Sequence, residues 1–395
     1  MRYTGLNAKD VKYFNRSALL NLLNDRGAVS RKDISEELGI TAATVTLICS
    51  DMLSSGILCE KGEAEQEKHV GRKKILVDIN YQYKFVLCLN IEAEITTLTL
   101  SDLSGSIIAK RQLETNGNIE PEKFLQEVAL AGEILINESG IMHENILGVG
   151  VSLPGVVFRN EGISQYAYRV WNKPAAVREI LSKYFAYPVI IENNVKAFAE
   201  GELTYGSGKA CDNILFVKWG PGVGSALIID GRIYNTEKNG AAEIGHIRVK
   251  KDGPICRCGK RGCLETFVSA HAIAERVRNS FTKNNMPKLF AKFKGDASKI
   301  KAGNISEWVN FPDEALQNIL SEAADMMAGV VTNLQRFLVP EKVIVYGKMF
   351  ELESIYEKFR ASCSDYDAED IECSELADKA DYVGALAVVM NEMFL

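Results

Sequence analysis

The segment from residue 246 to residue 265 constrains the fold of this chain most. Within it, Cys256, Cys258 and Cys263 fall inside a run of eight residues, with glycines between them and Pro254 just upstream. Glycine and proline interrupt helices and strands, so the segment cannot form a long helix or a regular strand. A tight turn that brings three thiol groups together is the structure that remains.

This cysteine spacing indicates a zinc site. Zinc binds four nitrogen or sulfur ligands in a tetrahedron, and three cysteines with one histidine form a common closed structural site. His246 is the expected fourth ligand, because the chain has only four histidines and this one opens the segment. Such a zinc has no open position, so we expect the metal to shape the loop over residues 246–263 rather than perform chemistry.

Free thiols are the alternative for the same three cysteines, and a disulfide is a further one. The other six cysteines are scattered along the chain at no framework spacing. This distribution is typical of a reducing compartment, where disulfides are rare. We therefore favour the metal site over both alternatives.

The length and composition set broad limits on the class of protein. A chain of 395 residues predicts two or three domains, and a net charge of -6 excludes a polycation. The sequence has no apolar run of 18 residues and therefore predicts no membrane span. Residues 1–15 lack the apolar core of a signal peptide, so we expect a cytoplasmic protein.

The first 80 residues carry the pattern of a winged helix-turn-helix. Apolar residues recur at helical spacing over residues 16–27, 31–38 and 42–54. Ser30 and Thr41 stand at the expected N-caps of the second and third helices, and Gly39 makes the turn between them. Two short helices joined by a glycine turn are typical of DNA-binding modules, whose recognition helix enters the major groove.

Residues 56–60 and 75–79 are predicted to form the two strands of a wing. The predicted DNA contacts lie near the start of the third helix and in the wing, at Thr41, Ala43, Thr44, Thr46, Arg72, Lys73 and Lys74. The basic residues of the wing would bind phosphates and set affinity more than sequence preference. The alternative is a three-helix module that packs against protein or forms a dimer.

Residues 81–395 alternate strands and helices, which predicts an α/β body. In such sheets, ligands bind beyond the carboxyl ends of the strands. Three polar or glycine-rich turns follow predicted strands, at residues 154–155, 193–194 and 220–224. The last of these is a weak phosphate signal by itself, and a loop that joins two strands is the simpler interpretation.

The chain resembles the ROK family of repressors, open reading frames and kinases. The most specific part of the match is Glu-Ile-Gly-His at residues 243–246, followed by the three cysteines and Leu-Glu at residues 264–265. The resemblance implies an actin-like or hexokinase-like body of two α/β lobes behind an N-terminal winged helix. It also implies that His246, Cys256, Cys258 and Cys263 bind zinc.

The resemblance further implies a sugar site. The residues that match the family's sugar ligands are Asn193, Asn194, Glu243, His246 and Glu265. Carboxylates and amides suit this role because they pair with neighbouring sugar hydroxyls, and such a site rejects isomers that leave a polar group unpaired. Trp171 could offer the sugar an aromatic face, with plain core packing as the alternative.

The chain departs from the family's kinases at the parts that transfer phosphate. An Asp-x-Gly-Gly loop is replaced by residues 90–94, which contain two glutamates and no glycine. Asn194 stands at the position of the catalytic aspartate, and an amide cannot act as a general base. Pro221 replaces a usual threonine, and Lys348 replaces the second glycine of a Gly-Gly pair. These changes predict that the protein is not an enzyme.

We interpret the chain as a sugar-responsive transcriptional regulator, and more specifically as a repressor. It would bind operator DNA as a homodimer or homotetramer and sense a sugar in a kinase-like cleft without phosphorylating it. The alternative is an active sugar kinase fused to a DNA-binding module. A zinc-stabilised scaffold whose winged helix binds protein is a third possibility. The residues do not identify the sugar or the operator.

Overall fold

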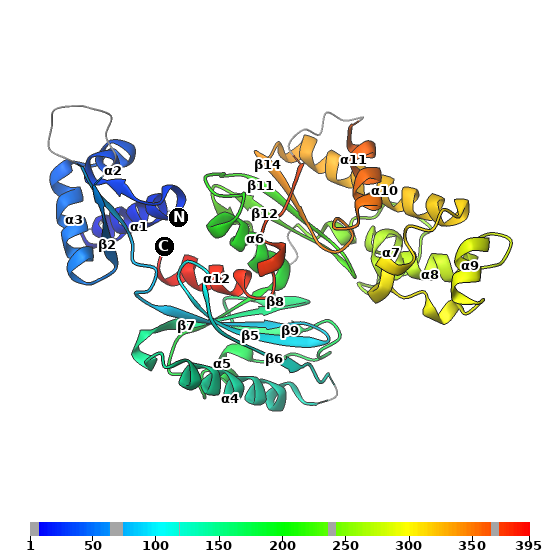
Figure 1. Ribbon diagram of the computed structural model, residues 1–395, viewed down its shortest axis with the longest axis horizontal. Helices are drawn as coiled ribbons and strands as arrows, with labels where there is room; N and C mark the ends of the chain where they lie inside the picture. Colours follow the sequence, from blue (N-terminus) through cyan, green and yellow to red (C-terminus); the bar gives the residue numbers. More distant parts are fainter. Residues whose placement is uncertain (1–7, 64–73, 118, 236–241, 365–370) are drawn as a thin grey trace. The chain divides into compact units, whose positions relative to one another are not determined.

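The structure is a computed structural model that describes residues 8–63, 74–117, 119–235, 242–364 and 371–395 (Figure 1). The chain divides into two compact units. Unit 1 comprises residues 1–205 and 379–395, and unit 2 comprises residues 206–378. Among the described residues, no helix has both the length and the apolar character needed to cross a membrane.

Unit 1 begins with the expected three helices, α1 (Ala8–Arg26), α2 (Arg31–Leu38) and α3 (Ala42–Ser54). The side chains of Ser30 and Thr41 accept hydrogen bonds from the backbone N–H groups of Asp33 and Thr44, so both predicted N-caps are confirmed. Gly39 has a φ of 65°, the left-handed conformation that ends α2. The apolar faces of the helices bury a core that includes Leu20, Ile34 and Val45.

The start predicted for the first helix was wrong. The sequence pattern placed it at residue 16, whereas α1 begins at Ala8. The added turns carry Val11, Tyr13 and Phe14, which are 45%, 66% and 49% exposed. Because these residues bury no common face within the chain, the apolar periodicity that predicts helices gave no sign of them.

The wing is present as a three-stranded antiparallel sheet in the order β1-β3-β2. Its strands are β1 (Val29–Ser30), β2 (Leu58–Glu63) and β3 (Ile75–Ile79). The segment between β2 and β3 includes Arg72 and Lys73, which lie outside the described residues. The winged helix-turn-helix is therefore confirmed as a fold.

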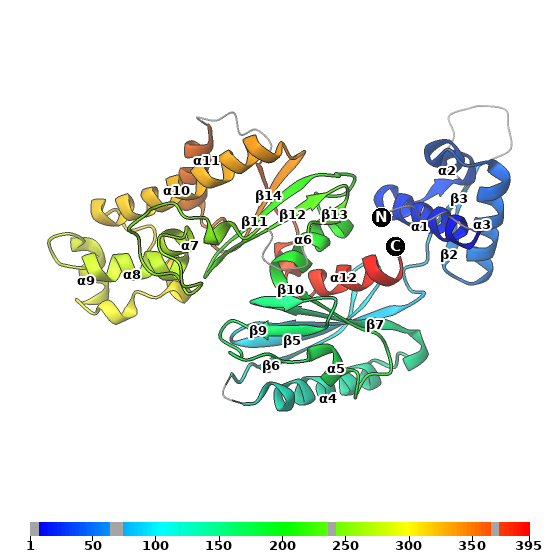
Figure 2. The ribbon, with the colours of Figure 1, turned by 180° about the vertical axis from the view of Figure 1, so that it is seen from behind.

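The body of unit 1 is a five-stranded sheet in the order β10-β7-β4-β5-β6. Its strands are β4 (Phe85–Ile91), β5 (Ile95–Asp102), β6 (Ile107–Glu114), β7 (Ile146–Leu153) and β10 (Val189–Asn193). Helix α4 (Pro121–Ser139) covers one face and α12 (Val383–Met393) covers the other, as Figures 1 and 2 show. Leu87 and Leu89 point into the α4 side, whereas Val86 and Cys88 point into the α12 side.

Gly150 explains how closely α12 approaches this sheet. A Cβ atom at this position of β7 would lie 1.9 Å from the carbonyl oxygen of Ala385 in α12. Only glycine leaves room for such a contact between backbones. Helix α6 (Asn194–Tyr205) packs beside α12 and begins directly after β10.

Unit 2 is built on a second five-stranded sheet, in the order β13-β12-β11-β14-β15. Its strands are β11 (Ile214–Trp219), β12 (Val223–Ile229), β13 (Arg232–Ile233), β14 (Lys342–Tyr346) and β15 (Ile371–Cys373). Leu215 and Val217 of β11 enter a core shared with α10 (Glu314–Leu338). The loop over residues 220–222 joins antiparallel strands β11 and β12, so the strand-joining interpretation of this glycine-rich stretch is confirmed.

The remaining elements are short or peripheral. They are β8 (Val156–Phe158), β9 (Ile163–Tyr166), α5 (Val177–Leu181), α7 (Glu265–Val268), α8 (Ala270–Ser280), α9 (Pro287–Phe293) and α11 (Glu353–Ser364). With the two sheets and their covering helices, they confirm the predicted α/β class.

Candidate functional site: a metal-ligand knuckle, a polar turn and a recognition helix

The cysteine-rich segment of unit 2 folds as a tight knuckle. Cys256 donates its backbone N–H to the carbonyl of Lys260 at 2.7 Å, and Gly259 donates back to the carbonyl of Cys256 at 2.9 Å. Gly262 has a φ of 75°, and a Cβ atom there would lie 1.6 Å from the carbonyl oxygen of Lys250. Glycine is therefore required at residue 262 for the chain to fold back on itself.

The knuckle brings His246, Cys256, Cys258 and Cys263 together as the sequence predicted. Their four ligand atoms all lie within 4.8 Å of one another. The Sγ atoms of Cys258 and Cys263 are 3.7 Å apart, and Cys256 Sγ lies 3.5 Å from His246 Nδ1. All nine cysteines of the chain lie in the described ranges and none forms a disulfide, which argues against the disulfide alternative.

These distances fit a tetrahedral metal ion. Zinc with bonds of about 2.3 Å to sulfur and about 2.0–2.1 Å to nitrogen holds neighbouring ligands about 3.5–3.8 Å apart. Both measured separations fall in that range, while a disulfide would need its sulfurs at about 2.05 Å. The cluster can therefore hold a metal ion, with His246 contributing Nδ1.

The thiols of the cluster differ in their acidity. Burial, followed by hydrogen bonds to the neighbouring cysteines, raises the pKa of Cys263 to about 12. This thiol therefore keeps its proton at neutral pH in the absence of a cation. A bound metal requires thiolates, so metal binding releases protons from this knuckle.

Glu265 follows the knuckle and has a fixed orientation. Its Oε2 accepts the backbone N–H of Val223 at 3.0 Å, and its Oε1 lies 3.3 Å from Arg257 Nε. Glu243, the other carboxylate of the predicted sugar site in unit 2, is exposed, and its carbonyl accepts the backbone N–H of His246 at 3.0 Å. Both glutamates of unit 2 that were predicted to bind the sugar thus lie close in sequence to the candidate metal ligands.

In unit 1, Asn193 and Asn194 lie where β10 ends and α6 begins. The side-chain oxygen of Asn193 accepts the backbone N–H of Val195 at 2.9 Å and caps α6. Its amide nitrogen donates to the carbonyl of Gly155 at 2.7 Å. The predicted turns at residues 154–155 and 193–194 are therefore neighbours, as expected for the carboxyl ends of the parallel strands β7 and β10.

Asn194 contacts Glu92, which lies in residues 90–94, another of the segments expected to depart from the kinase pattern. Its amide nitrogen donates to Glu92 Oε1 at 2.8 Å, although 102 residues separate the two positions. An aspartate at residue 194 would place a second carboxylate against Glu92. The structure thus pairs these two residues, since the amide of Asn194 donates to the carboxylate of Glu92.

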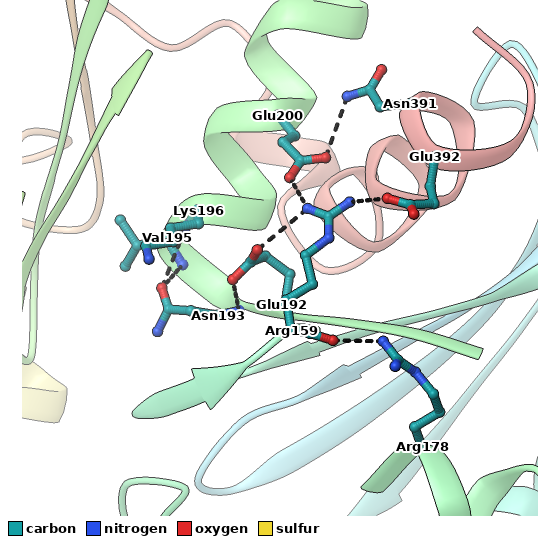
Figure 3. A network of polar contacts seen from close by, with 9 residues as sticks. All are labelled: Arg159, Arg178, Glu192, Asn193, Val195, Lys196, Glu200, Asn391 and Glu392. Atoms are coloured by element: carbon teal, nitrogen blue, oxygen red, sulfur yellow. Dashed lines mark hydrogen bonds and ion pairs between the residues drawn. The ribbon is translucent and has the colours of Figure 1, made fainter. Parts of the chain in front are cut away.

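A cluster of ion pairs adjoins this turn, as Figure 3 shows. Arg159, which follows β8, lies 3.3 Å from Glu192 on β10 and also contacts Glu200 on α6. A further ion pair of 3.2 Å joins it to Glu392 on α12. The side chains of Glu192 and Glu200 are only 1% and 5% exposed. We name Arg159, Glu192, Glu200 and Glu392 the Arg159 cluster.

The environment of the Arg159 cluster perturbs its acid–base equilibria. Burial is the largest effect on Glu192 and raises its pKa, with a further increase from Glu200 and an opposing decrease from Arg159. Burial alone would lower the pKa of Arg159, but Glu200 and Glu192 raise it above its ordinary value. A permanent guanidinium thus compensates two carboxylates that water cannot reach.

The sequence interpretation missed the Arg159 cluster. Glu192 precedes Asn193 at the end of a strand, and Arg159 stands alone after a short strand with no motif around it. Its partners come from three elements that are far apart in the chain. No spacing rule could have brought them together.

Trp171 does not serve as an open aromatic face. It is 7% exposed, belongs to the core beneath β4 and β7, and donates its indole N–H to Ser164 Oγ at 3.1 Å. The core-packing alternative is therefore the correct one.

The residues predicted to contact DNA lie in unit 1, apart from two outside the described ranges. Thr41, Ala43 and Thr46 are exposed at the start of α3, and Thr44 is partly exposed. Lys74 precedes β3, where its ammonium lies 2.8 Å from Asp33 Oδ1. The hydrogen bond from Lys74 is the largest of the effects that hold the pKa of Asp33 below its usual value.

A winged helix followed by an α/β body with a cysteine–histidine knuckle defines a ROK-type protein. The chain belongs to the ROK family, whose model matches residues 86–392. It is 25% identical to the xylose repressor of Caldicellulosiruptor bescii over 391 residues, covering 97% of each chain. It is also 25% identical to the DNA-binding transcriptional dual regulator NagC of Escherichia coli over 394 residues, covering 97% of this chain and 94% of NagC.

Solved structures agree with this fold. A ROK family transcriptional regulator, described as a homologue of the E. coli MLC protein, superposes with a TM-score of 0.81 at 21% identity and covers 96% of both chains. A ROK glucokinase of Streptomyces griseus, in complex with glucose and AMPPNP, gives a TM-score of 0.64 at 23% identity. The glucokinase match covers 76% of this chain and 98% of the kinase, whereas the regulator match extends over nearly the whole of both chains.

Proposed function

We propose that this protein is a sugar-responsive transcriptional repressor that binds operator DNA through its winged helix and does not phosphorylate its effector. The hydrogen bond between Asn194 and Glu92 is the observation that carries the proposal. The resemblance to the family's kinases implies that Asn194 replaces their catalytic base and Glu92 lies in the segment that replaces their phosphate loop, and an amide cannot act as a base. The names of the repressors that resemble the whole chain support the same conclusion.

The proposed sugar ligands are Asn193 and Asn194 from unit 1 and Glu243, His246 and Glu265 from unit 2. Their chemistry supports the role, because each pairs donors or acceptors with hydroxyl groups. Glu265 is held in one orientation by Val223 and Arg257, so it presents a preset acceptor. His246 faces the cysteines through Nδ1, which leaves Nε2 as the nitrogen for a sugar hydroxyl. We propose zinc as the metal and a structural role for it.

The arrangement of α6 supports a response that reaches the winged helix. Asn193 caps the first turn of this helix, and near its other end the carbonyl of Thr204 accepts a buried hydrogen bond of 3.0 Å from Asn24 of α1. A rigid helix that touches both regions is a suitable element to carry a change of conformation between them. We further propose that the protein acts as a homodimer or homotetramer in the cytoplasm, where the chromosome is accessible.

Binding measurements test the proposal directly. Full-length protein should enrich a palindromic sequence from a random duplex pool, and one sugar of a panel should change the affinity for that sequence by about 5- to 150-fold, the usual range of allosteric coupling. The panel should include pentoses, hexoses, amino sugars and their phosphates. Failure to enrich any DNA would favour the scaffold alternative, and an operator affinity that no sugar changes would remove the effector role.

An ATP-consumption assay with the same panel should show no turnover for the wild type. Asn194→Asp alone should not create activity, because it does not restore the glycines of the phosphate loop. The new carboxylate would face Glu92 at a partly buried site and lower stability by about 1 kcal/mol, the typical contribution of the hydrogen bond that is lost. Thermal unfolding of this variant beside Asn194→Ala separates charge repulsion from loss of the hydrogen bond. Sugar-dependent ATP hydrolysis by the wild type would establish the kinase alternative.

A further inference from the structure

The recognition helix presents an unusual outer face. Ala43, Thr46, Leu47 and Ser50 follow the three- and four-residue spacing of one helix face, and all four are exposed. We call them the α3 outer face. Leu47 is 70% exposed, whereas Val45, Ile48 and Met52 point into the core. No residue from 42 to 50 carries a charge.

The hydroxyl groups at the start of α3 are engaged inside the protein. Thr46 Oγ1 donates to the carbonyl of Ala42 at 2.7 Å. The hydroxyls of Thr41 and Thr44 lie 2.9 Å from each other, and Thr41 also caps the helix. Ala43, Thr46 and Leu47 therefore offer mainly methyl groups on this face, beside the exposed hydroxyl of Ser50.

The thymine C5 methyl group is the feature of the major groove that best matches such a largely apolar surface. Guanine, cytosine and adenine offer hydrogen-bonding groups there, while thymine also presents its C5 methyl group. The side chains that pair bidentately with guanine or adenine are arginine, lysine, asparagine and glutamine, and residues 42–50 contain none of them. The first turn of α3 carries no acidic residue, and the positive end of the helix dipole favours approach to phosphates.

We infer that the α3 outer face reads thymine methyl groups and that Leu47 is its principal specificity-determining residue. The inference rests on the proposed DNA-binding function and adds the kind of base contact that selects the operator. Affinity comes from phosphate contacts elsewhere on the winged helix. Selection comes from apolar contacts that a base pair without a thymine methyl group cannot make.

Replacing operator thymines by deoxyuracil tests this inference. Deoxyuracil keeps every hydrogen-bonding group of thymine and lacks only the methyl group. At one or more positions of each half-site, the replacement should weaken binding by about fourfold, the factor for one apolar group of methyl size removed from the interface. The operator is the sequence that full-length protein enriches from the random pool.

Leu47→Ala is the matching protein variant. It should bind the thymine operator more weakly and show nearly equal affinity for the thymine and deoxyuracil forms at the position that Leu47 contacts. Leu47→Met should retain the discrimination, because it keeps an apolar side chain of similar volume. The dependence of affinity on salt should match that of the wild type, since no phosphate contact is removed. Leu47 is exposed, so the variant should also keep the wild-type melting temperature.

The outcomes separate the inference from the function on which it rests. An enriched operator that tolerates deoxyuracil within twofold at every position would overturn the inference and leave the DNA-binding proposal intact. Equal weakening of both operator forms by Leu47→Ala would do the same. A pool that yields no enriched sequence would overturn both.

Discussion

Replacing Arg159 by methionine should lower the free energy of unfolding by about 3–5 kcal/mol, the typical result of removing one partner from a buried ion pair. The methionine fills a similar volume but leaves Glu192 and Glu200 buried without a counter-charge. Urea unfolding monitored by circular dichroism measures the loss. Glu192 Oε1 accepts a hydrogen bond of 2.6 Å from the backbone N–H of Asn193. The turn that carries the proposed sugar ligands should therefore also loosen.

Arg111→Met is the matched control for this experiment. Arg111 pairs with Glu138 at 2.8 Å, and their side chains are 33% and 61% exposed. Removing a surface ion pair costs about 0–1 kcal/mol, so this variant should remain close to the wild type. Equal effects of the two substitutions would contradict the structural role assigned to the Arg159 cluster.

The pH dependence of the Arg159→Met penalty identifies its cause. Burial already raises the pKa of Glu192, and losing Arg159 removes an effect that lowers it. A carboxyl with a raised folded-state pKa is not penalised while it is protonated in both states, and the penalty grows as pH rises above the unfolded pKa. The variant should therefore be closer to the wild type at pH 5 than at pH 8. A penalty independent of pH would point to lost packing instead.

Cys258→Ser should release the metal from the knuckle. The purified wild type should contain one zinc per chain by elemental analysis. The variant should bind the ion at least about 100-fold more weakly, because changing even the hydrogen-bond partners of metal ligands costs about 10- to 100-fold. Cys258 is exposed, so its replacement removes a ligand without disturbing the core. Loss of the metal should also lower the melting temperature and increase hydrogen exchange over residues 254–263.

Cys373→Ser supplies the control, since this cysteine is also exposed and lies outside the cluster. It should keep the metal content and melting temperature of the wild type. A strong chelator should reproduce the effect of Cys258→Ser on the wild type and leave that variant unchanged. Wild-type protein that contains no metal, and whose melting temperature the chelator does not change, would refute the zinc proposal.

Local patterns predicted much of this molecule correctly. Several features depend only on residues close together in the chain, so the sequence could predict them. They are the caps at Ser30 and Thr41, the glycine turn at Gly39 and the spacing of the cysteines in the knuckle. The α/β class followed from alternating strands and helices in the same way. The early start of α1 was not predicted, because its first turns bury no apolar face. The apolar periodicity that predicts a helix reflects which of its side chains are buried.

The amino-acid sequence by itself therefore predicted the α/β class, the winged helix and the grouping of one histidine with three cysteines, because short-range geometry dictates each of them. Only the tertiary structure decided which distant charges meet. It joined Asn194 to Glu92, and it surrounded Arg159 with carboxylates from β10, α6 and α12. Electrostatic energy depends on separation and burial in space, and neither quantity can be read from the positions of residues along a chain.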